Sequence, residues 1–456
     1  MPIISINPTT GSAIQAYDEM TPSLVATAIE DAADSWRDWR ATSFAERAEL
    51  LRVTAGILRE RKDELARLMA LEMGKPVKQG VAEAEKCAWV CEYYADNGER
   101  HLAPDVIPTD ARRSYVAFQP LGVVLAVMPW NFPLWQVYRF AAPALMAGNA
   151  GLLKHASNVP GCALVIEEIF RRAGAPDGLF RTLLVGSEQV KRVIEHPLVR
   201  AVTLTGSTPA GRAVASQAGA VLKKTVLELG GSDPYLVLDD ADMEQAVTTC
   251  VNSRLINSGQ SCISAKRFIV AQPVLAEFTE RFIALMRTKR MGDPLDPASD
   301  LGPQARADLR DGLHQQVRHS VERGATLAMG GEVPSGAGAF YPPTVLTHVT
   351  PGMPAFDEEL FGPVAAIIAA DNDADAIRLA NHSVFGLGAA VFTRDTARGE
   401  QVALALEAGA TFVNGLVASD PRLPFGGIKE SGYGRELGSY GIREFVNIKT
   451  VHIAAR

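Results

Sequence analysis

The sequence predicts an α/β fold with more than one domain. With 456 residues, the chain is too long for a single ordinary core. Beyond the first hundred residues, short runs of valine, isoleucine and leucine alternate with amphipathic stretches, the pattern of parallel strands connected by helices. The 47% hydrophobic and 21% charged fractions are typical of a water-soluble globular protein. Two α/β domains are the simplest arrangement that fits these observations.

The N-terminal hundred residues are predicted to be mostly helical. Thr21 followed by Pro22 is a helix start, and the apolar spacing continues to about residue 40. Ser43 with Glu46 three residues later is a capping-box pattern, and a second apolar face continues to about residue 62.

Strands and helices then alternate in two rounds. The first round predicts strands at 123–128, 151–154, 180–185 and 201–205, with helices at about 133–148, 158–173 and 187–195. The second predicts strands at 235–238, 266–271, 364–370, 389–393 and 411–414, with a helix at about 274–286. The glycine- and proline-rich segment 329–343 is predicted to be an exposed loop between a helix and a strand.

Charge and composition exclude several classes of protein. Lys and Arg total 45 against 52 Asp and Glu, and the net charge of −7 argues against nucleic-acid or anionic-membrane binding. The longest apolar runs are far shorter than the roughly 20 residues of a membrane-spanning helix. The N-terminus has no export-signal pattern, so a cytoplasmic location is expected. The five cysteines suit neither a disulfide framework nor a zinc site, and no metal site is predicted.

One cysteine and one glutamate stand out as candidates for chemistry. Cys262 ends a polar, glycine-containing turn, which suits a nucleophile, whereas the other four cysteines lie in apolar helical surroundings typical of core packing. Glu228 lies between two leucines, just before Gly230-Gly231. Burial there would raise its pKa and suit a general base, although a salt bridge or a helix cap fits equally well.

Two turns follow predicted strands. Gly206 to Gly211 opens a helix, where backbone N–H groups bind phosphate, although an ordinary helix start explains it too. Pro129-Trp130-Asn131-Phe132-Pro133 is either a rigid turn or a way to aim the Asn131 amide at an oxyanion.

Taken together, these segments resemble the NAD(P)-dependent aldehyde dehydrogenase superfamily over essentially the whole chain. The matching segments, in family order, are Pro129 to Pro133, Lys154, Gly206-Ser207-Thr208 with Gly211, Leu227 to Gly231, Gly259 to Cys262, Glu359 to Pro363, and Pro424 to Gly427 with Ser431-Gly432. The resemblance implies two α/β domains with open, twisted, mainly parallel sheets and a β oligomerisation arm. It divides the chain into a cofactor-binding domain (1–101 and 121–230), a catalytic domain (231–430) and the arm (102–120 and 431–456), so a homodimer or homotetramer is expected.

The resemblance also implies the reaction. Cys262 would attack the aldehyde carbon while Asn131 and the Cys262 backbone N–H hold the oxyanion, and hydride would pass to the nicotinamide. Glu228 would then activate the water that hydrolyses the thioester.

The implied cofactor site consists of residues on both sides of that cysteine. Its predicted members are Trp130, Lys154, Ser157, Gly206, Ser207, Leu229, Glu359 and Phe361. Many relatives that prefer NAD have Glu where this chain has Ser157, and that Glu repels a 2′-phosphate. NADP should therefore be accepted as well as NAD. His155 replaces the usual Pro after Lys154, which leaves the preference between the two open.

Within the superfamily, the chain resembles the short bacterial succinate-semialdehyde dehydrogenases. This resemblance implies oxidation of succinate semialdehyde to succinate, with another short aliphatic or ω-carboxylated aldehyde as the alternative substrate. Arg139 matches an Arg of that group that binds the remote carboxylate of the substrate. The second such Arg is Ile256 here, and Arg254 lies two residues earlier, a displacement that would turn it away on a helix. Ser419 is a further candidate contact.

Two other classes remain as alternatives. One is a cysteine thioesterase or amidase without nicotinamide, but His155, His314 and His319 lie in no Cys-His motif. The other is a non-enzymatic protein of the same fold, in which Cys262 or Glu228 would be expected to be lost.

Overall fold

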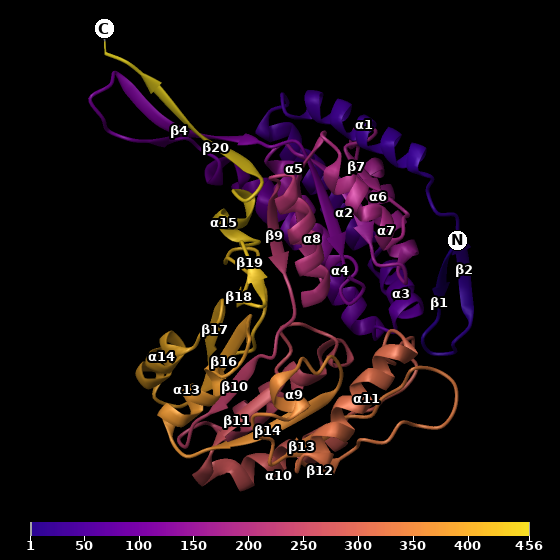
Figure 1. Ribbon diagram of the computed structural model, residues 1–456, viewed down its shortest axis with the longest axis vertical. Coiled ribbons are helices and arrows are strands. Elements are labelled where there is room, and N and C mark those ends of the chain that lie inside the picture. The colour runs from indigo at the N-terminus through magenta and orange to yellow at the C-terminus, as the bar shows by residue number, and fades with distance from the viewer. Residues whose placement is uncertain (1, 456) are drawn as a thin grey trace.

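In the computed structural model, which describes residues 2–455, two lobes follow each other along the chain and an antiparallel arm projects from the first (Figure 1). The lobes are joined where the strand that ends at Glu228 leads into Pro234. The C-terminal segment runs back from the second lobe to the first and then enters the arm. The boundary between the lobes therefore lies beside Glu228 and the glycines that follow it.

A six-stranded sheet forms the centre of the first lobe. Its strands, in spatial order, are β19 (Gly432–Tyr433), β9 (Lys224–Glu228), β8 (Val199–Thr205), β5 (Val123–Met128), β6 (Ala150–His155) and β7 (Phe180–Thr182). All neighbours are parallel except the edge pair of β19 and β9. The sequence VVLAVM of β5 is buried almost throughout because helices cover both faces of a parallel sheet.

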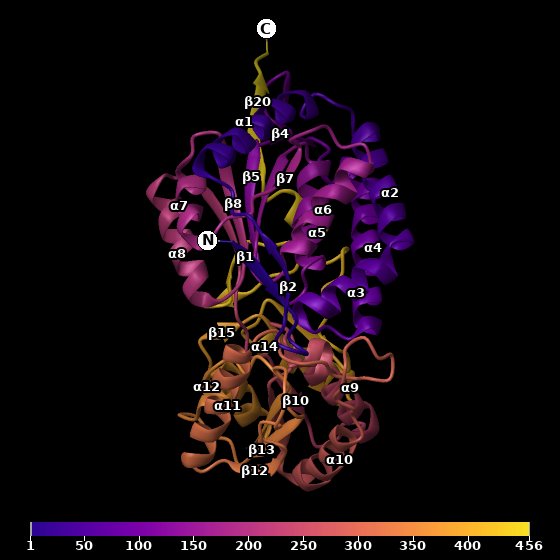
Figure 2. The same ribbon diagram turned by 90° about the vertical axis from the view of Figure 1, so that its right-hand side faces the viewer.

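Helices cover this sheet on both sides (Figure 2). They are α1 (Pro22–Trp39), α2 (Phe44–Glu60), α3 (Lys62–Met73), α4 (Val77–His101), α5 (Trp135–Met146), α6 (Pro160–Arg172), α7 (Ser187–Glu195) and α8 (Thr208–Ala220). The predicted capping box forms at the start of α2, where Ser43 Oγ accepts the Glu46 N–H at 3.2 Å and the Glu46 carboxylate accepts the Ser43 N–H at 2.8 Å. Helices α7 and α8 lie on one side of the sheet and α2, α4, α5 and α6 on the other.

The second lobe contains a seven-stranded sheet. Its strands, in spatial order, are β12 (Thr326–Met329), β13 (Thr344–Thr347), β14 (Val364–Ala370), β11 (Arg267–Ala271), β10 (Pro234–Val237), β16 (Gly388–Phe392) and β17 (Ala410–Val413). Only β12 is antiparallel to its neighbour. Its helices are α9 (Met243–Leu255), α10 (Leu275–Arg287), α11 (Ala307–Glu322), α12 (Pro354–Asp357), α13 (Asp373–Asn381) and α14 (Thr396–Ala405).

The arm consists of β20 (Val446–Ile453), β4 (Arg113–Pro120) and β3 (Asp105–Val106), all antiparallel. Before the chain enters the arm, β19 extends the six-stranded sheet and α15 (Gly438–Ile442) packs near α4 and α5. Two small strand pairs complete the structure, β1 (Ile3–Ile6) with β2 (Ala13–Tyr17) and β15 (Phe385–Gly386) with β18 (Ile428–Lys429). We propose that the domains divide as the sequence predicts.

The predicted α/β fold with mainly parallel sheets is confirmed. The sequence interpretation missed the β1–β2 hairpin within the first hundred residues. The segment 329–343 connects two strands, β12 and β13, rather than a helix and a strand, and Tyr341 within it is buried. None of the helices within residues 2–455 combines the length and the apolar character needed to cross a membrane.

Candidate active site

The carboxyl ends of parallel strands in the first lobe bring several predicted residues to one edge. Asn131 follows β5, Ser207 follows β8, and Glu228 is the last residue of β9. The second lobe faces this edge with Cys262, which precedes β11, and Glu359, which precedes β14. The topology therefore gathers side chains that lie more than two hundred residues apart in sequence.

The turn that carries Cys262 has an unusual backbone. Asn257, Ser258 and Gly259 all have positive φ angles, of 52°, 56° and 78°. Asn257 Nδ2 donates to the Asn131 carbonyl at 2.6 Å and to the Gln260 carbonyl at 3.1 Å. A Cβ at Gly259 would overlap the backbone of Gly362. Strain of this kind persists only where the surroundings enforce it, and it is common at functional sites.

Cys262 is half-buried and lies between two cavities. A cavity of about 240 Å³ is lined by Pro129, Trp130, Asn131, Gln136, Thr205, Gly206, Ser207, Leu229, Gly230, Cys262, Leu309, Glu359 and Phe361. A second, of about 270 Å³, is lined by Gln79, Ala82, Glu83, Lys86, Phe132, Trp135, Gln136, Arg139, Ile256, Ser261, Cys262, Ile263, Leu416, Val417, Ala418, Ser419 and Phe425. Of the described residues, only Gln136 and Cys262 line both, so Cys262 borders each cavity.

Hydrogen bonds fix the amide of Asn131 beside the thiol. Gln136 Nε2 donates to Asn131 Oδ1 at 3.1 Å, which assigns the oxygen end of the amide, and Asn131 Nδ2 donates to the Gln260 carbonyl at 3.0 Å. One Nδ2 hydrogen remains for another acceptor. Within residues 2–455 the Cys262 backbone N–H has no acceptor. These two donors suit an oxyanion formed at Cys262.

Burial raises the pKa of the Cys262 thiol to about 12, an effect that the positive charges of Arg139 and Lys266 partly offset. Burial therefore favours the protonated thiol over the thiolate. Because a thiolate is the nucleophile, the site needs a proton acceptor or added positive charge before Cys262 can react.

Glu228 is almost completely buried, and neither of its carboxylate oxygens has a hydrogen-bond partner among the described residues. Desolvation and the nearby Glu436 raise its pKa well above the usual range. Glu228 lines neither cavity, and a Cβ on Gly426 would lie only 2.7 Å from its Oε1.

The predicted cofactor residues fall into two groups. Trp130 and Phe361 form an edge-to-face pair in the 240 Å³ cavity, with ring centroids 5.6 Å apart, and Ser207 lies at the N-cap of α8. Glu359 accepts the Gly231 N–H at 3.0 Å. Lys154 and Ser157 lie outside this cavity, on and just beyond the end of β6, and Ser157 lines a separate hollow with Gly186 and Arg306.

The predicted substrate residues do not all line the same cavity. Arg139 and Ser419 line the 270 Å³ cavity, on the side of Cys262 away from the predicted cofactor residues. Arg254 is fully buried in α9 and donates to the Gly259 carbonyl at 2.7 Å, so it supports the turn that carries Cys262 and does not line the cavity. Ile256 does line it, with an apolar side chain.

The model of the aldehyde dehydrogenase family matches residues 2–451 of this chain. The chain belongs to the aldehyde dehydrogenase family. This confirms the resemblance on which the sequence interpretation rested.

Curated relatives and solved structures cover essentially the whole of this aldehyde dehydrogenase. It is 51% identical, over the full length of both chains, to a protein of Synechocystis sp. named probable succinate-semialdehyde dehydrogenase [NADP(+)]. It is 50% identical to the succinate-semialdehyde dehydrogenase [NADP(+)] of Mycobacterium avium, covering 100% of this chain and 97% of that one. The crystal structure of the Streptococcus pyogenes succinic semialdehyde dehydrogenase with NADP+ superposes with a TM-score of 0.97, at 39% identity, over 99% of this chain and all of that chain.

The residues around the 240 Å³ cavity of the aldehyde dehydrogenase fit a nicotinamide dinucleotide. The N-terminus of α8 opens into it at Ser207, whose side chain makes no capping bond, so the first N–H groups of the helix can receive a pyrophosphate. Gly230 provides room that a Cβ would fill, because such an atom would crowd the Glu359 carboxylate. Trp130 and Phe361 supply flat apolar walls.

Three polar residues near the thiol were missed from the sequence. Gln136 orients Asn131, Glu436 forms an ion pair with Arg139, and Lys86 of α4 lines the 270 Å³ cavity of the dehydrogenase. The sequence Glu436-Leu437-Gly438 repeats the pattern Glu228-Leu229-Gly230, and this signal could have marked Glu436 as it marked Glu228. Lys86 lies in a helix with several charged residues, and its sequence gives no sign that it turns inward.

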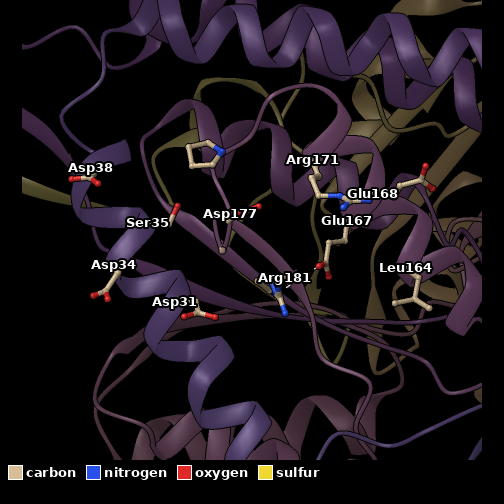
Figure 3. A pocket seen from close by; sticks show the side chains of 12 residues that line it. Asp31, Asp34, Ser35, Asp38, Leu164, Glu167, Glu168, Arg171, Asp177 and Arg181 are labelled. Atoms are coloured by element: carbon tan, nitrogen blue, oxygen red, sulfur yellow. Dashed lines mark ion pairs between the residues drawn. The ribbon is translucent and has the colours of Figure 1, made fainter.

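A larger hollow of this dehydrogenase, of about 770 Å³, lies away from Cys262 between α1 and α6 (Figure 3). Most of its charged side chains are acidic, among them Asp31, Asp34, Asp38 and Asp177, and Arg181 forms an ion pair with Glu167. None of the predicted catalytic or cofactor residues lines it.

Proposed function

We propose that this protein oxidises succinate semialdehyde to succinate with NADP as the preferred cofactor, and that it also accepts NAD. The observation that carries the proposal is the position of Cys262 between a cavity suited to a dinucleotide and a cavity with basic side chains. The relatives named above as succinate-semialdehyde dehydrogenases, at 50% identity over the whole chain, support the same substrate.

The first step is addition of the Cys262 sulfur to the aldehyde carbon. The Cys262 thiol gives its proton to a water, the sulfur forms the new C–S bond, and the carbonyl π pair moves to oxygen, where the Asn131 Nδ2 and Cys262 N–H donors stabilise the charge. Bound NADP supplies the chemistry that the chain lacks, by accepting a hydride from the former aldehyde carbon.

Glu228 is the proposed general base for hydrolysis of the resulting thioester. A carboxylate whose pKa is raised by burial is a stronger base than one in water, so it can take a proton from water as the oxygen attacks the acyl carbon. The acid is then released and the thiol is restored.

The proposed preference for NADP rests on Ser157, two residues beyond the end of β6. Ser157 has no charge to repel a 2′-phosphate, and the nearby Lys154 carries a cation. The Streptococcus pyogenes enzyme, solved with NADP+, supports the use of the phosphorylated cofactor. We also propose that the enzyme works in the cytoplasm.

The test is an absorbance assay for reduced nicotinamide with the purified protein. Succinate semialdehyde and butanal, an uncharged aldehyde of equal length, are each supplied with NAD and with NADP. Strong preference for the carboxylated aldehyde with NADP is expected. Turnover of butanal alone would reject the substrate, and no turnover with either aldehyde would reject the function.

A further inference from the structure

The 270 Å³ cavity beside Cys262 contains a lysine, Lys86, that has no role in the reaction steps proposed above. Lys86 projects from α4, and its ammonium donates to Ser419 Oγ at 2.8 Å. The same nitrogen lies 4.4 Å from the ring centroid of Trp135, in cation–π contact. Two walls of the cavity therefore hold the head of Lys86 in place.

The other cation of this cavity, Arg139, already has partners inside the protein. Its guanidinium forms a buried ion pair with Glu436, donates to Thr205 Oγ1 at 3.2 Å, and stacks over Phe425 with 4.7 Å to the ring centroid. Arg139 is thus neutralised before any substrate arrives.

Lys86 has no such partner. Within residues 2–455, no carboxylate forms an ion pair with it at 4.0 Å or less. Glu83, one turn earlier, is paired with Lys75 and accepts the Leu134 and Trp135 N–H groups, each at 2.9 Å. Asp420 is paired with Arg422 at 2.6 Å.

An ammonium that is removed from water without a counter-ion is costly. Burial, with a contribution from Arg139, lowers the pKa of Lys86 to about 8. A carboxylate that enters the cavity would supply the missing negative charge. Of the three hydrogens on the ammonium, one is used by Ser419, so the others can face that carboxylate.

We propose that Lys86, positioned by Ser419, binds the carboxylate of the substrate at the end remote from the aldehyde. This rests on the proposed function, since it assigns the residue that makes the enzyme selective for an ω-carboxylated aldehyde. Lys86 takes the place of the second Arg that the family pattern leads one to expect at Ile256, and Arg139 mainly balances Glu436.

Three variants test the assignment. Lys86→Met removes the charge and keeps the aliphatic stem. Lys86→Arg keeps a charge. Lys78→Met removes an exposed lysine from the same helix outside the cavity, as a matched control. Each variant is assayed with NADP on succinate semialdehyde and on butanal, and its melting temperature is measured.

For Lys86→Met, kcat/KM on succinate semialdehyde should fall by about 30-fold or more relative to kcat/KM on butanal, mainly through KM. Lys86→Arg should recover part of the preference, and Lys78→Met should match the wild type on both substrates. Equal losses on the two aldehydes, or a Lys86→Met preference equal to that of Lys78→Met, would overturn the assignment. Failure of the wild type to oxidise either aldehyde would instead reject the proposed function.

The dependence on pH gives a second readout that needs no change in folding. The charged groups around Lys86 are Glu83 on α4, Arg139 on α5 and Asp420 in the loop after β17, with the Cys87 thiol beside it. In the wild type, the ratio of kcat/KM between the two aldehydes should fall as pH rises through about 8, because the ammonium loses its proton. Ionisation of Cys262 affects both aldehydes and cancels. In Lys86→Arg the ratio should stay level, and a wild-type ratio that stays level to pH 9.5 would contradict the proposal.

Discussion

At the scale of single residues, the site depends on three buried charged groups. Glu228, Arg139 and Glu436 lie close enough to influence one another, and Arg139 offsets only part of the negative charge. Burial raises the pKa of both carboxyl groups, and Glu228, which forms no ion pair within residues 2–455, is the one that we propose as the base. The Arg139–Glu436 ion pair thus shifts the pKa of Glu228 without a hydrogen bond to it.

Replacing Cys262 by Ala should lower kcat by at least about a thousand-fold, because no other described thiol lines either cavity. NADP affinity, measured by fluorescence titration, should change little. Cys250→Ala is a control, since Cys250 is buried in the core of the second lobe. Substantial turnover by the Cys262 variant would remove it as the nucleophile.

Glu228→Gln should leave the first turnover intact and slow the next, so that a burst of reduced cofactor precedes a slow steady state. In the wild type, deacylation should slow as pH falls through the raised pKa of Glu228, because only the carboxylate accepts a proton. Stopped-flow absorbance at several pH values measures both. An unchanged steady-state rate in the variant would exclude Glu228 as the base.

At the scale of elements, the turn before Cys262 is held in a conformation that most residues avoid. Gly259→Ala adds a Cβ that overlaps the Gly362 backbone at a φ of 78°. We expect a loss of about 2 kcal/mol or more in unfolding free energy, together with a lower kcat. Gly312→Ala, at an open position in α11, is the control for chemical denaturation. Equal stability of the two variants would show that the turn adapts.

His155, the last residue of β6, forms hydrogen bonds to the segments that follow β5 and β6. Its Nε2 bonds to the Pro133 carbonyl at 2.8 Å, beside the segment that carries Asn131, and Nδ1 accepts the Ala156 N–H at 2.9 Å. Burial lowers the pKa of His155 to about 4, so the folded protein favours the neutral ring. A lowered pKa gives stability that is present above the unfolded value of about 6.5 and is lost as pH falls toward 4.

As pH falls from about 6.5 to 4, His155 alone should lower the unfolding free energy by about 3 kcal/mol at most. His155→Gln should be less stable at pH 7 and should show a shallower decline between pH 6.5 and 4.5 than the wild type. Urea unfolding at each pH measures the difference. Parallel declines in the two proteins would show that His155 does not contribute to acid sensitivity.

At the scale of the whole molecule, the strands are easier to predict from the sequence than the contacts between distant segments are. Runs such as VVLAVM are buried on both faces, and their apolar character alone predicts β5. The short strand β19 is held by pairing with β9, about 200 residues earlier, and no local pattern marks it. Lys86 was missed for the same reason, because its direction depends on Trp135 and Ser419 from distant segments.

The arm is the part of the molecule most in need of a partner. Strands β4 and β20 extend beyond the first lobe (Figure 1), and Val106, Ile107 and Ile448 are exposed, the last by 63%. We expect the predicted dimer or tetramer to cover these side chains. Ile448→Asp should lower the molar mass in solution, measured by light scattering, whereas Leu404→Asp, at an exposed site on α14, should not. A monomeric wild type would contradict this prediction.

The two cavities that meet at Cys262 also bear on the order of events in a catalytic cycle. Because Cys262 lines both cavities, a dinucleotide held in one and a substrate held in the other would approach the sulfur from different sides. Under the proposed function, neither ligand would then block the path of the other.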